Sequence, residues 1–231
     1  MKVTRCSEYV LQLTRFAAVF PMNCFLVTEP EGLTLVDSTI RSPAAEVGRL
    51  ARELGLPVTR IALTHAHSDH VGGVAGVRSA YPDAEISISQ RDARLLRGDR
   101  SLDPGEAQTS IKGSFAKLDW TPGRELQPGD RVGSLEVMPS PGHTPGHVAF
   151  LETRSRTLIA GDAFQTRGGI AVAGTVRPLF PFVALGTWNK PTALESAREL
   201  RRLDPAVLAV GHGMPISAPA AAMDRALRAA S

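Results

Sequence analysis

The chain has 231 residues, 43% of them hydrophobic and 21% charged, and its formal net charge is +3 at pH 7. This length suits one domain with a sizeable core, so we expect a single domain over residues 1–231. The small charge excess argues against a nucleic-acid partner, and no apolar segment is long enough to suggest a membrane partner. Because no apolar signal segment stands at the amino terminus, we expect a cytoplasmic protein.

Strands and helices alternate in the first half of the chain. Three strands are predicted first, over 9–16, 23–28 and 33–37. A helix follows, with Ser42 as its candidate cap and Gly55 at its end. The remaining elements of this half are a strand over 58–64, a helix from about Val71 that stops before Pro82, a strand over 84–89 and a short helix capped by Ser89.

The second half has a similar order. Residues 99–130 are polar and irregular, and no element or role is assigned to them. Three strands then follow, over 134–138, 147–152 and 157–161. A helix over 193–203, with Thr192 and Glu195 spaced as a capping box, leads to a strand over 206–210 and an alanine-rich final helix. This order indicates two β-sheets packed face to face with helices outside, in two similar halves.

Polar side chains gather where the apolar strands end. Five strands lead into corners that present histidine or aspartate, and these residues are Asp37, His65, His67, Asp69, His70, His143, Asp162 and His212. Strand ends on one edge of a sheet can face a common basin, so we expect these loops to meet there. A single buried histidine is usually a core residue, but three in one short loop favour metal binding.

The segment THAHSDHVGG, residues 64–73, has the spacing of a metal site. In extended backbone, His65 and His67 point to the same side, so both can bind one metal ion. Asp69 and His70 follow as the chain turns into a helix, and they would face a second position close to the first. Seven candidate ligands are available in total: His65, His67, Asp69, His70, His143, Asp162 and His212. Seven are too many for one tetrahedral ion and suit two divalent ions that share a carboxylate. The donors are nitrogen and oxygen, which fits zinc, with manganese or iron as alternatives.

These motifs, HAHSDH, PGHTPGH, GD after a strand and GHG after a strand, resemble the metallo-β-lactamase superfamily of hydrolases over about Asn23 to Gly213. The resemblance implies an α+β fold, a four-layer αββα sandwich, with a two-metal site at one edge. It assigns His65, His67 and His143 to the first metal, Asp69, His70 and His212 to the second, and Asp162 to both. It also implies that Asp37 braces a metal-binding histidine and that His147 is a structural hydrogen-bonder rather than a ligand.

The resemblance further implies a mechanism. A hydroxide shared by two cations would attack a substrate carbonyl, and Asp69 would orient it and pass a proton to the leaving group. No serine nucleophile in a G-x-S-x-G motif is present. We therefore expect a dinuclear metal-dependent hydrolase that acts on a small-molecule ester, lactone or thioester.

Within the superfamily, the chain resembles the hydroxyacylglutathione hydrolase and lactonase branch, with departures. True β-lactamases of the superfamily have cysteine where Asp162 stands, so that activity is not expected. Hydroxyacylglutathione hydrolases add a helical region with basic residues for glutathione, and only 19 residues follow His212, so we do not expect that substrate. Gln165 stands where lactonases place a tyrosine.

A substrate pocket is expected from two segments, 164–190 and the loop over 19–23. The apolar candidates are Phe20, Met22, Phe164, Phe182 and Trp188, and the candidates for binding a carboxylate are Arg167, Arg177 and Lys190. Two alternatives stay open. One is an oxidoreductase similar to the persulfide dioxygenases, with one iron held by two histidines and one aspartate. The other is a metal-binding module without catalysis. The sequence carries no signal for the oligomeric state.

Overall fold

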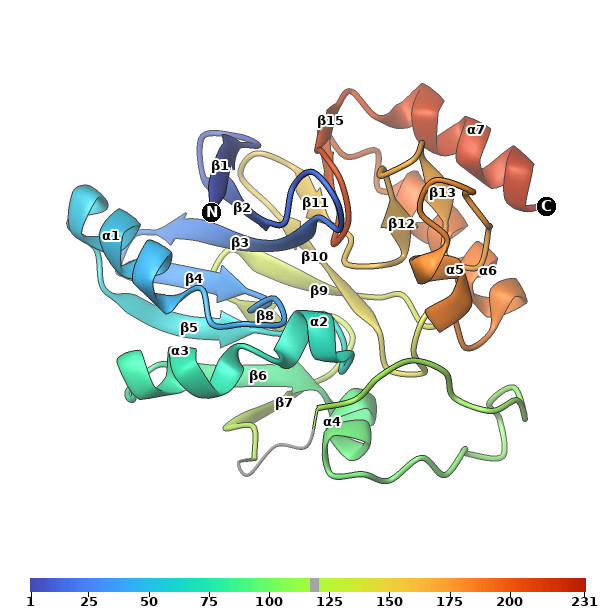
Figure 1. Cartoon of the computed structure of the whole chain (residues 1–231), viewed down its shortest axis with the longest axis horizontal. Helices are drawn as coiled ribbons and strands as arrows, with labels where there is room; N and C mark the ends of the chain where they lie inside the picture. Colours follow the sequence, from blue (N-terminus) through green and yellow to red (C-terminus); the bar gives the residue numbers. More distant parts are fainter. Residues whose placement is uncertain (117–120) are drawn as a thin grey trace.

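The computed structural model describes residues 1–116 and 121–231. Two large β-sheets form its centre (Figure 1). The first sheet has seven strands in chain order: β1 (Lys2–Arg5), β2 (Val10–Arg15), β3 (Met22–Glu29), β4 (Gly32–Val36), β5 (Val58–Ala62), β6 (Glu85–Ser89) and β7 (Arg124–Leu126). The second has six, in the order β15 (Ile216–Ser217), β14 (Val207–Ala209), β11 (Thr157–Ile159), β10 (Val148–Glu152), β9 (Leu135–Pro139) and β8 (Arg131–Val132). A small hairpin pairs β12 (Phe164–Gln165) with β13 (Ala171–Val172).

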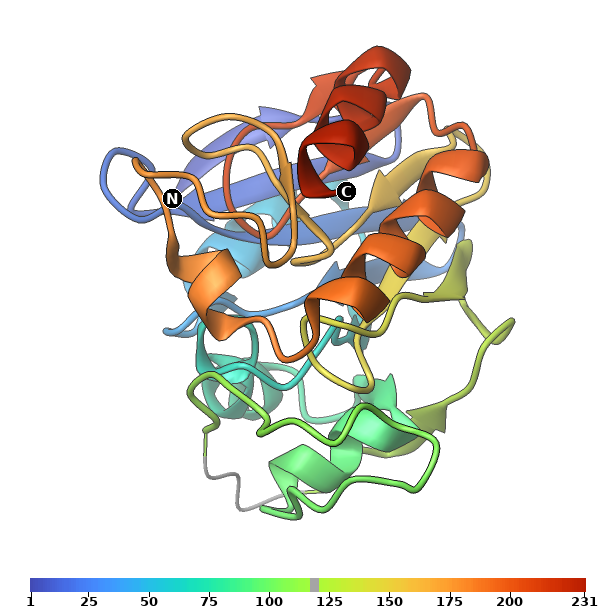
Figure 2. The same cartoon turned by 90° about the vertical axis from the view of Figure 1, so that its right-hand side faces the viewer.

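Helices cover the outer face of each sheet. The first half contributes α1 (Ala44–Leu54), α2 (Ser68–Val71), α3 (Val74–Ala80) and α4 (Gln90–Leu96), and the second contributes α5 (Phe182–Gly186), α6 (Lys190–Arg202) and α7 (Ala220–Ala230). Figure 2 looks onto α6 and α7, with the sheets behind them. The layers are therefore helix, sheet, sheet, helix, which confirms the expected α+β sandwich. None of the described helices has the length and apolar character needed to cross a membrane.

Alternation of side chains along the strands explains the layers. On β3, Phe25 and Val27 face the second sheet and share a core cluster with Phe150 of β10. The intervening Leu26 faces the other way, into the cluster formed with α1 and α3. Leu151 of β10 likewise faces outward, toward α6 and α7. Because successive side chains on a strand point to opposite faces, a strand buried on both faces is apolar throughout.

Parallel pairing places the ends of several strands at the same edge. β4 pairs in parallel with β5, and β5 with β6. In the second sheet, β11 pairs in parallel with β14. The carboxyl ends of parallel strands lie at one edge of their sheet, and the segments that follow β4, β5, β11 and β14 carry all the predicted aspartates and histidines except His143, which follows β9. The fold therefore brings these segments together.

Several predicted elements differ from the structure. The helix expected from Val71 is two short helices, α2 and α3, because Gly72 and Gly73 lie against backbone; a Cβ on Gly73 would be 2.4 Å from the Ser38 carbonyl oxygen. The prediction that Thr192 and Glu195 form a capping box is wrong. Helix α6 begins earlier, and the Asn189 side chain caps it by accepting a hydrogen bond from the Thr192 backbone N–H.

The unassigned segment 99–130 contains one strand, β7, and residues 117–120 lie outside the described part. The expected cap Ser89 is confirmed, because its hydroxyl accepts from the Asp92 N–H at 3.1 Å. Gly55 ends α1 with a φ of 68°, a left-handed conformation that glycine adopts without strain.

Candidate metal centre

The seven predicted ligands converge at the edge where the strands end. Three groups have ligand atoms within 4.8 Å of one another: His65, His67 and His143; His65, His70 and Asp162; and Asp69, His70 and His212. The first and third are the two triads expected from the sequence. Asp162 lies between them, with Oδ2 at 3.3 Å from Nε2 of both His143 and His212, and Oδ1 at 3.4 Å from Nε2 of His70. The geometry suits a carboxylate that bridges two ions.

Backbone carbonyls determine which nitrogen of two histidines faces the centre. Nε2 of His67 lies 2.9 Å from the Lys112 carbonyl oxygen, and Nδ1 of His212 lies 2.7 Å from that of Pro21. Because a carbonyl oxygen only accepts hydrogen bonds, these ring nitrogens carry the protons. The opposite nitrogens, Nδ1 of His67 and Nε2 of His212, therefore face the centre and are the atoms that would bind a metal.

Asp37 sets the orientation of two more histidines. Its Oδ2 accepts a hydrogen bond from Nδ1 of His70 at 2.8 Å and another from the Thr64 hydroxyl at 2.8 Å. The Thr64 hydroxyl thus donates to Asp37 and accepts from Nδ1 of His65, 3.0 Å away. One buried carboxylate therefore leaves Nε2 of both His65 and His70 as the available donors to a metal. This matches the bracing role expected for Asp37.

A second threonine does the same for His143. The Thr187 hydroxyl donates to the Val183 carbonyl oxygen at 2.7 Å, so it accepts from Nδ1 of His143 at 3.1 Å. Neither threonine was identified from the sequence. A hydroxyl beside a histidine becomes informative only when its own hydrogen-bond acceptor is known.

The ligand atoms themselves fit a cation. Within the described part of the chain, Nε2 of His65, Nε2 of His70 and Oδ1 of Asp162 are buried and have no hydrogen-bond partner. A buried polar atom without a partner costs about 1–3 kcal/mol, so three of them facing one point indicate that something binds there. Nitrogen and carboxylate donors suit zinc, manganese or iron.

Burial and charge divide the histidines into two classes. Burial lowers the pKa of His65 and His143 well below the usual value and also lowers that of His67. Burial acts in the same direction on His70 and His212, but the Asp162 carboxylate outweighs it. The pKa of His70 is raised well above its usual value, and that of His212 is raised to about 10. In the metal-free chain both would be protonated at neutral pH.

This charge state predicts that metal binding releases protons. His70 and His212 must lose their protons to become ligands, so we expect about two protons to be released per chain at pH 7. Isothermal titration calorimetry in buffers of different ionisation enthalpy measures this number. Binding without proton release would contradict the assignment of both histidines as ligands.

The sign of the pH effect on stability follows from the same shift. A histidine whose pKa is raised on folding stabilises the folded state fully below its unfolded pKa of about 6.5, and this stabilisation is lost as pH rises through its folded pKa. For His212 of the metal-free chain, the window runs from about 6.5 to about 10. Its contribution to the melting temperature should decline across that range, and saturating metal should remove the dependence.

His147 holds a ligand in place without being one. Its Nε2 accepts a hydrogen bond from the Asp162 backbone N–H at 3.0 Å, and its Nδ1 lies 2.8 Å from the Ser140 hydroxyl. Burial lowers the pKa of His147 to about 3, which keeps the ring neutral and able to accept. This arrangement agrees with the expected structural role.

Asp92 was not identified from the sequence, where it reads as an ordinary acidic residue of a short helix. It is fully buried and links two loops that carry ligands. Its Oδ2 accepts from the Ala66 N–H at 2.9 Å and from the Thr144 hydroxyl at 2.7 Å, and its Oδ1 accepts from the Gly146 N–H at 2.8 Å. Ala66 separates His65 from His67, and Thr144 follows His143, so one carboxylate positions all three ligands of the first triad.

Part of the unassigned segment 99–130 also belongs to the site. Besides the Lys112 carbonyl that holds His67, Gly113 lies directly against the imidazole, and a Cβ there would be 2.0 Å from Nε2. Gly113 has a φ of 100°, which only glycine adopts readily. This close approach explains a glycine that no sequence motif marks.

A pocket of about 350 Å³ opens over the candidate ligands. Its lining consists of His67, Asp69, Gly113, Ser114, His143, Asp162, Phe182, Val183, Leu185, Gly186 and His212. Of the eight residues predicted for the substrate pocket, Phe182 is in this lining. Phe20 packs beside it, with ring centroids 4.8 Å apart from Phe182 and 5.3 Å from His212.

The structure places the other apolar candidates elsewhere. Phe164 is buried in the core beneath α6 and α7, and Met22 is buried on β3. Trp188 is buried and donates its indole N–H to the Thr109 carbonyl oxygen at 2.8 Å. These three residues support the pocket wall from behind or pack in the core, which corrects the expectation that they line the pocket.

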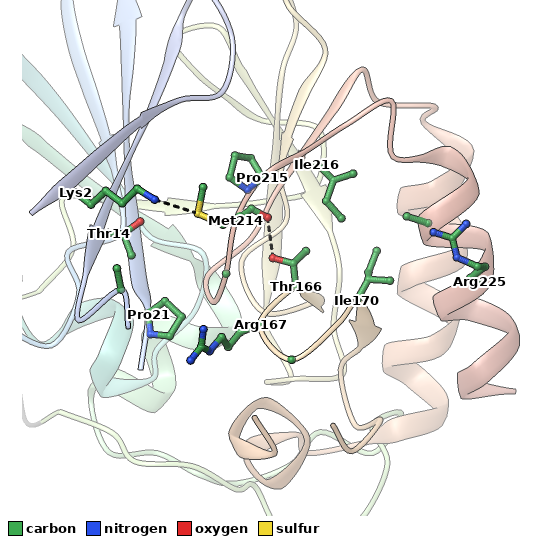
Figure 3. A pocket seen from close by; sticks show the side chains of 14 residues that line it. Lys2, Thr14, Pro21, Thr166, Arg167, Ile170, Met214, Pro215, Ile216 and Arg225 are labelled. Carbon is green, nitrogen blue, oxygen red and sulfur yellow. Dashed lines mark hydrogen bonds between the residues drawn. The ribbon is translucent and has the colours of Figure 1, made fainter. Parts of the chain in front are cut away.

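The three cationic candidates are also corrected. Arg167 donates to the Ala18 carbonyl oxygen and lines a separate cavity of about 600 Å³, beside Pro21 and Met214 (Figure 3). Arg177 donates to the Ile170 carbonyl oxygen. The stem of Lys190 packs beside Gly174, where a Cβ would lie 2.6 Å from its Cγ. None of the three side chains is in the lining of the pocket over the candidate ligands.

Comparison with known proteins finds matches over most of the chain. A family model described as Metallo-beta-lactamase superfamily matches residues 17–212. Uncharacterized protein YobT of Bacillus subtilis (strain 168) is 46% identical over 231 residues, which cover 100% of this chain and 99% of that protein. A crystal structure of TTHA1623 in a di-iron-bound form has a TM-score of 0.65 and 27% identity, and covers 90% of this chain and 95% of that one.

Two more distant relatives have named activities. A hydroxyacylglutathione hydrolase of Synechococcus sp. (strain JA-3-3Ab) is 33% identical over 164 residues, 68% of this chain and 55% of that protein. The mitochondrial persulfide dioxygenase ETHE1 of Mus musculus is 31% identical over 140 residues, 61% of this chain and 46% of that protein. This chain thus matches about half the length of each.

Proposed function

Because this chain belongs to the metallo-β-lactamase superfamily, whose members are generally metal-dependent hydrolases, we propose that it is a dinuclear hydrolase that cleaves an acyl bond in an ester, lactone or thioester. The observation that carries the proposal is the position of Asp162, within 3.4 Å of histidines from both triads. A carboxylate between two complete ligand sets is the arrangement that two-metal hydrolysis requires.

Each triad would hold one divalent cation, His65, His67 and His143 the first and Asp69, His70 and His212 the second, with Asp162 shared. Zinc is the first expectation, with manganese or iron as alternatives. When bound, the two cations lower the pKa of water toward neutrality and act as Lewis acids toward a carbonyl oxygen.

Asp69 is the residue that we assign to proton handling. Its carboxylate lines the pocket and lies 3.2 Å from Nε2 of His212. Burial disfavours its charged form, but the hydrogen bond from His212 outweighs this and lowers the pKa of Asp69 below its usual value. An ionised carboxylate at this position can orient the attacking water by accepting a hydrogen bond from it, take up the proton that the water loses, and pass that proton to the leaving group.

Water rather than a side chain is the nucleophile in this proposal. The described lining of the pocket contains one hydroxyl, that of Ser114. The Ser114 hydroxyl lies 3.2 Å from the hydroxyl of Ser68, which cannot serve as a general base. A serine nucleophile needs an adjacent base, so the serine offers no competing mechanism.

Metal removal tests the proposal. Protein stripped by a chelator should lose at least about 99% of its turnover of p-nitrophenyl esters, lactones or thioesters, and added Zn²⁺ or Mn²⁺ should restore it. Metal analysis of the restored protein should give two ions per chain. Full activity in the stripped protein, or no activity toward any of these substrates when both sites are loaded, would contradict the proposal.

The persulfide dioxygenase relative makes an oxidoreductase the second candidate. That reading expects one iron per chain and oxygen consumption with a persulfide substrate. The second triad argues against it, because Asp69 and His212 would have no ligand role in a site of two histidines and one aspartate. The number of metal ions per chain and the oxygen consumption measured with an electrode distinguish the hydrolase from the oxidoreductase. A metal-loaded chain that shows neither hydrolysis nor oxygen consumption would instead be a metal-binding module.

A further inference from the structure

We infer that the acyl group of the substrate is neutral and apolar. This inference rests on the proposed hydrolase function and adds the chemical class of the group that the pocket accepts. Three features of the pocket carry it: one apolar wall, an apolar rim exposed on α5 and the segments next to it, and a lining without a cationic side chain.

The apolar wall comes from helix α5. Phe182, Val183 and Leu185 face the pocket from one side, and Gly186 follows them directly above the metal ligands. A Cβ on Gly186 would lie 3.4 Å from Cε1 of His143. The missing side chain leaves space next to the imidazole, so the wall brings an apolar group close to the reacting atoms without blocking them.

The wall is held rigidly. The Phe182 ring packs against Phe20 and Phe180, with ring centroids 4.8 Å and 5.1 Å apart. Farther along the chain, the Trp188 backbone N–H donates to the His143 carbonyl oxygen at 3.0 Å. The wall is therefore tied to the loop of one ligand and to an aromatic cluster. A preformed apolar surface of this kind selects substrates by shape and hydrophobicity.

Large apolar side chains remain exposed on α5, at the pocket, and on the segments next to it. Phe182 and Leu185 keep 51% and 64% of their surface exposed, and the adjoining loops present Val19 at 81% and Leu179 at 82%. Phe20 contacts Phe182, so the loop that carries Val19 adjoins α5. We call Val19, Leu179, Phe182 and Leu185 the apolar rim. Apolar residues clustered on a surface mark a binding site, and this cluster adjoins the catalytic pocket.

In the described part of the chain, no cationic side chain faces the apolar wall of α5 to pair with an anionic acyl group. Among the residues the structure describes, the pocket lining includes neither lysine nor arginine. The sequence offered Arg167, Arg177 and Lys190, but none of the three lines the pocket, and the two arginines donate to backbone carbonyls outside it. A substrate carboxylate would be taken out of water against α5 without a partner, which strongly disfavours it.

The volume limits the size of the group. A pocket of about 350 Å³ lies at the lower end of the range for ligand sites, roughly 300–1,000 Å³. A short to medium acyl chain fits, and a longer chain would extend over the apolar rim. The substrates that we infer therefore have a neutral, apolar acyl group, and substrates whose acyl group carries a carboxylate are excluded.

Three esters with the same leaving group test the inference on metal-loaded protein: p-nitrophenyl acetate, p-nitrophenyl hexanoate and the mono-p-nitrophenyl ester of adipic acid. Each methylene that contacts the wall should raise kcat/KM by about three- to fourfold, so hexanoate should exceed acetate by about one to two orders of magnitude. Adipate differs from hexanoate by a terminal carboxylate, and it should react at least about tenfold more slowly.

Variants of Leu185 locate the effect. Leu185→Ser should lower kcat/KM for hexanoate more than for acetate, and Leu185→Arg should narrow or reverse the preference for hexanoate over adipate. The matched control is Leu54→Ser, which changes an exposed leucine on α1 and should alter neither ratio. Equal rates for hexanoate and adipate, or an unchanged ratio in Leu185→Arg, would overturn the inference.

Two further measurements separate this inference from the proposed function. If the metal-loaded protein hydrolyses no ester, lactone or thioester, the hydrolase proposal fails. Ligand-observed NMR with hexanamide and the monoamide of adipic acid then still tests the pocket, and stronger binding of the charged amide would overturn the inference. Sedimentation of wild type and Leu185→Ser provides the other check. If the wild type is a dimer and Leu185→Ser is a monomer, and if kcat/KM falls equally for acetate and hexanoate, the apolar rim is a contact between two copies of the chain. That result would overturn the inference.

Discussion

Asp162→Ala should lose both metal ions and lower kcat/KM by about three orders of magnitude or more. The Asp162 carboxylate lies 3.3 Å from Nε2 of His143 and of His212, and 3.4 Å from that of His70. Alanine removes the shared ligand and the only carboxylate that contacts histidines of both triads within the described residues. Metal analysis and steady-state kinetics measure the two losses together.

Charge and shape can be separated at this position. Asp162→Asn keeps the size of the side chain but removes its negative charge, so it should retain the fold and still bind metal weakly. Asp83→Ala is the control, because Asp83 is an exposed carboxylate in the turn before β6. Turnover at the wild-type level in Asp162→Ala would refute the assignment of Asp162 as the shared ligand.

Asp92→Ala should destabilise the fold by about 3–5 kcal/mol and weaken the first triad selectively. Alanine leaves the Ala66 N–H, the Thr144 hydroxyl and the Gly146 N–H without their acceptor in a buried place. Each such loss costs about 1–3 kcal/mol. Denaturant unfolding of the metal-free protein measures the change in the free energy of unfolding.

A milder variant keeps the prediction testable if Asp92→Ala does not fold. Asp92→Asn retains one acceptor oxygen, and we expect it to fold with the metal affinity of the first triad lowered by about 10–100-fold. The second triad is braced separately by Asp37, so its affinity should stay near that of the wild type. Equal weakening at both sites would show that Asp92 acts only through general stability. Asp83→Asn is the matched control.

The two carboxylates differ in how visible they are in the sequence. Asp162 follows a strand in the motif GD, and its partners stand at the ends of other strands, so its role can be predicted. Asp92 lies on α4 with no recognisable motif, and its three partners lie between 26 and 54 residues away along the chain. Only the packing of α4 against the two ligand loops reveals what it does.

The order of the main strands and helices, two packed sheets with helices outside, and the seven residues that converge at the centre could be predicted from the sequence. These features depend on signals that repeat locally: side-chain alternation along strands, and histidine or aspartate just after an apolar run. Element boundaries at glycine pairs, such as Gly72 and Gly73, depended on close backbone contacts that no local pattern shows.

The tertiary structure alone decided the direction of each long side chain near the site. Phe182 faces the pocket and Phe164 the core, and Arg167 reaches a carbonyl on another loop. Residues in a motif that directly follows a strand can be predicted to meet, because the ends of the strands meet at one edge of the sheet. The direction of a flexible side chain in an irregular segment depends instead on its neighbours in space, and these come from distant parts of the chain.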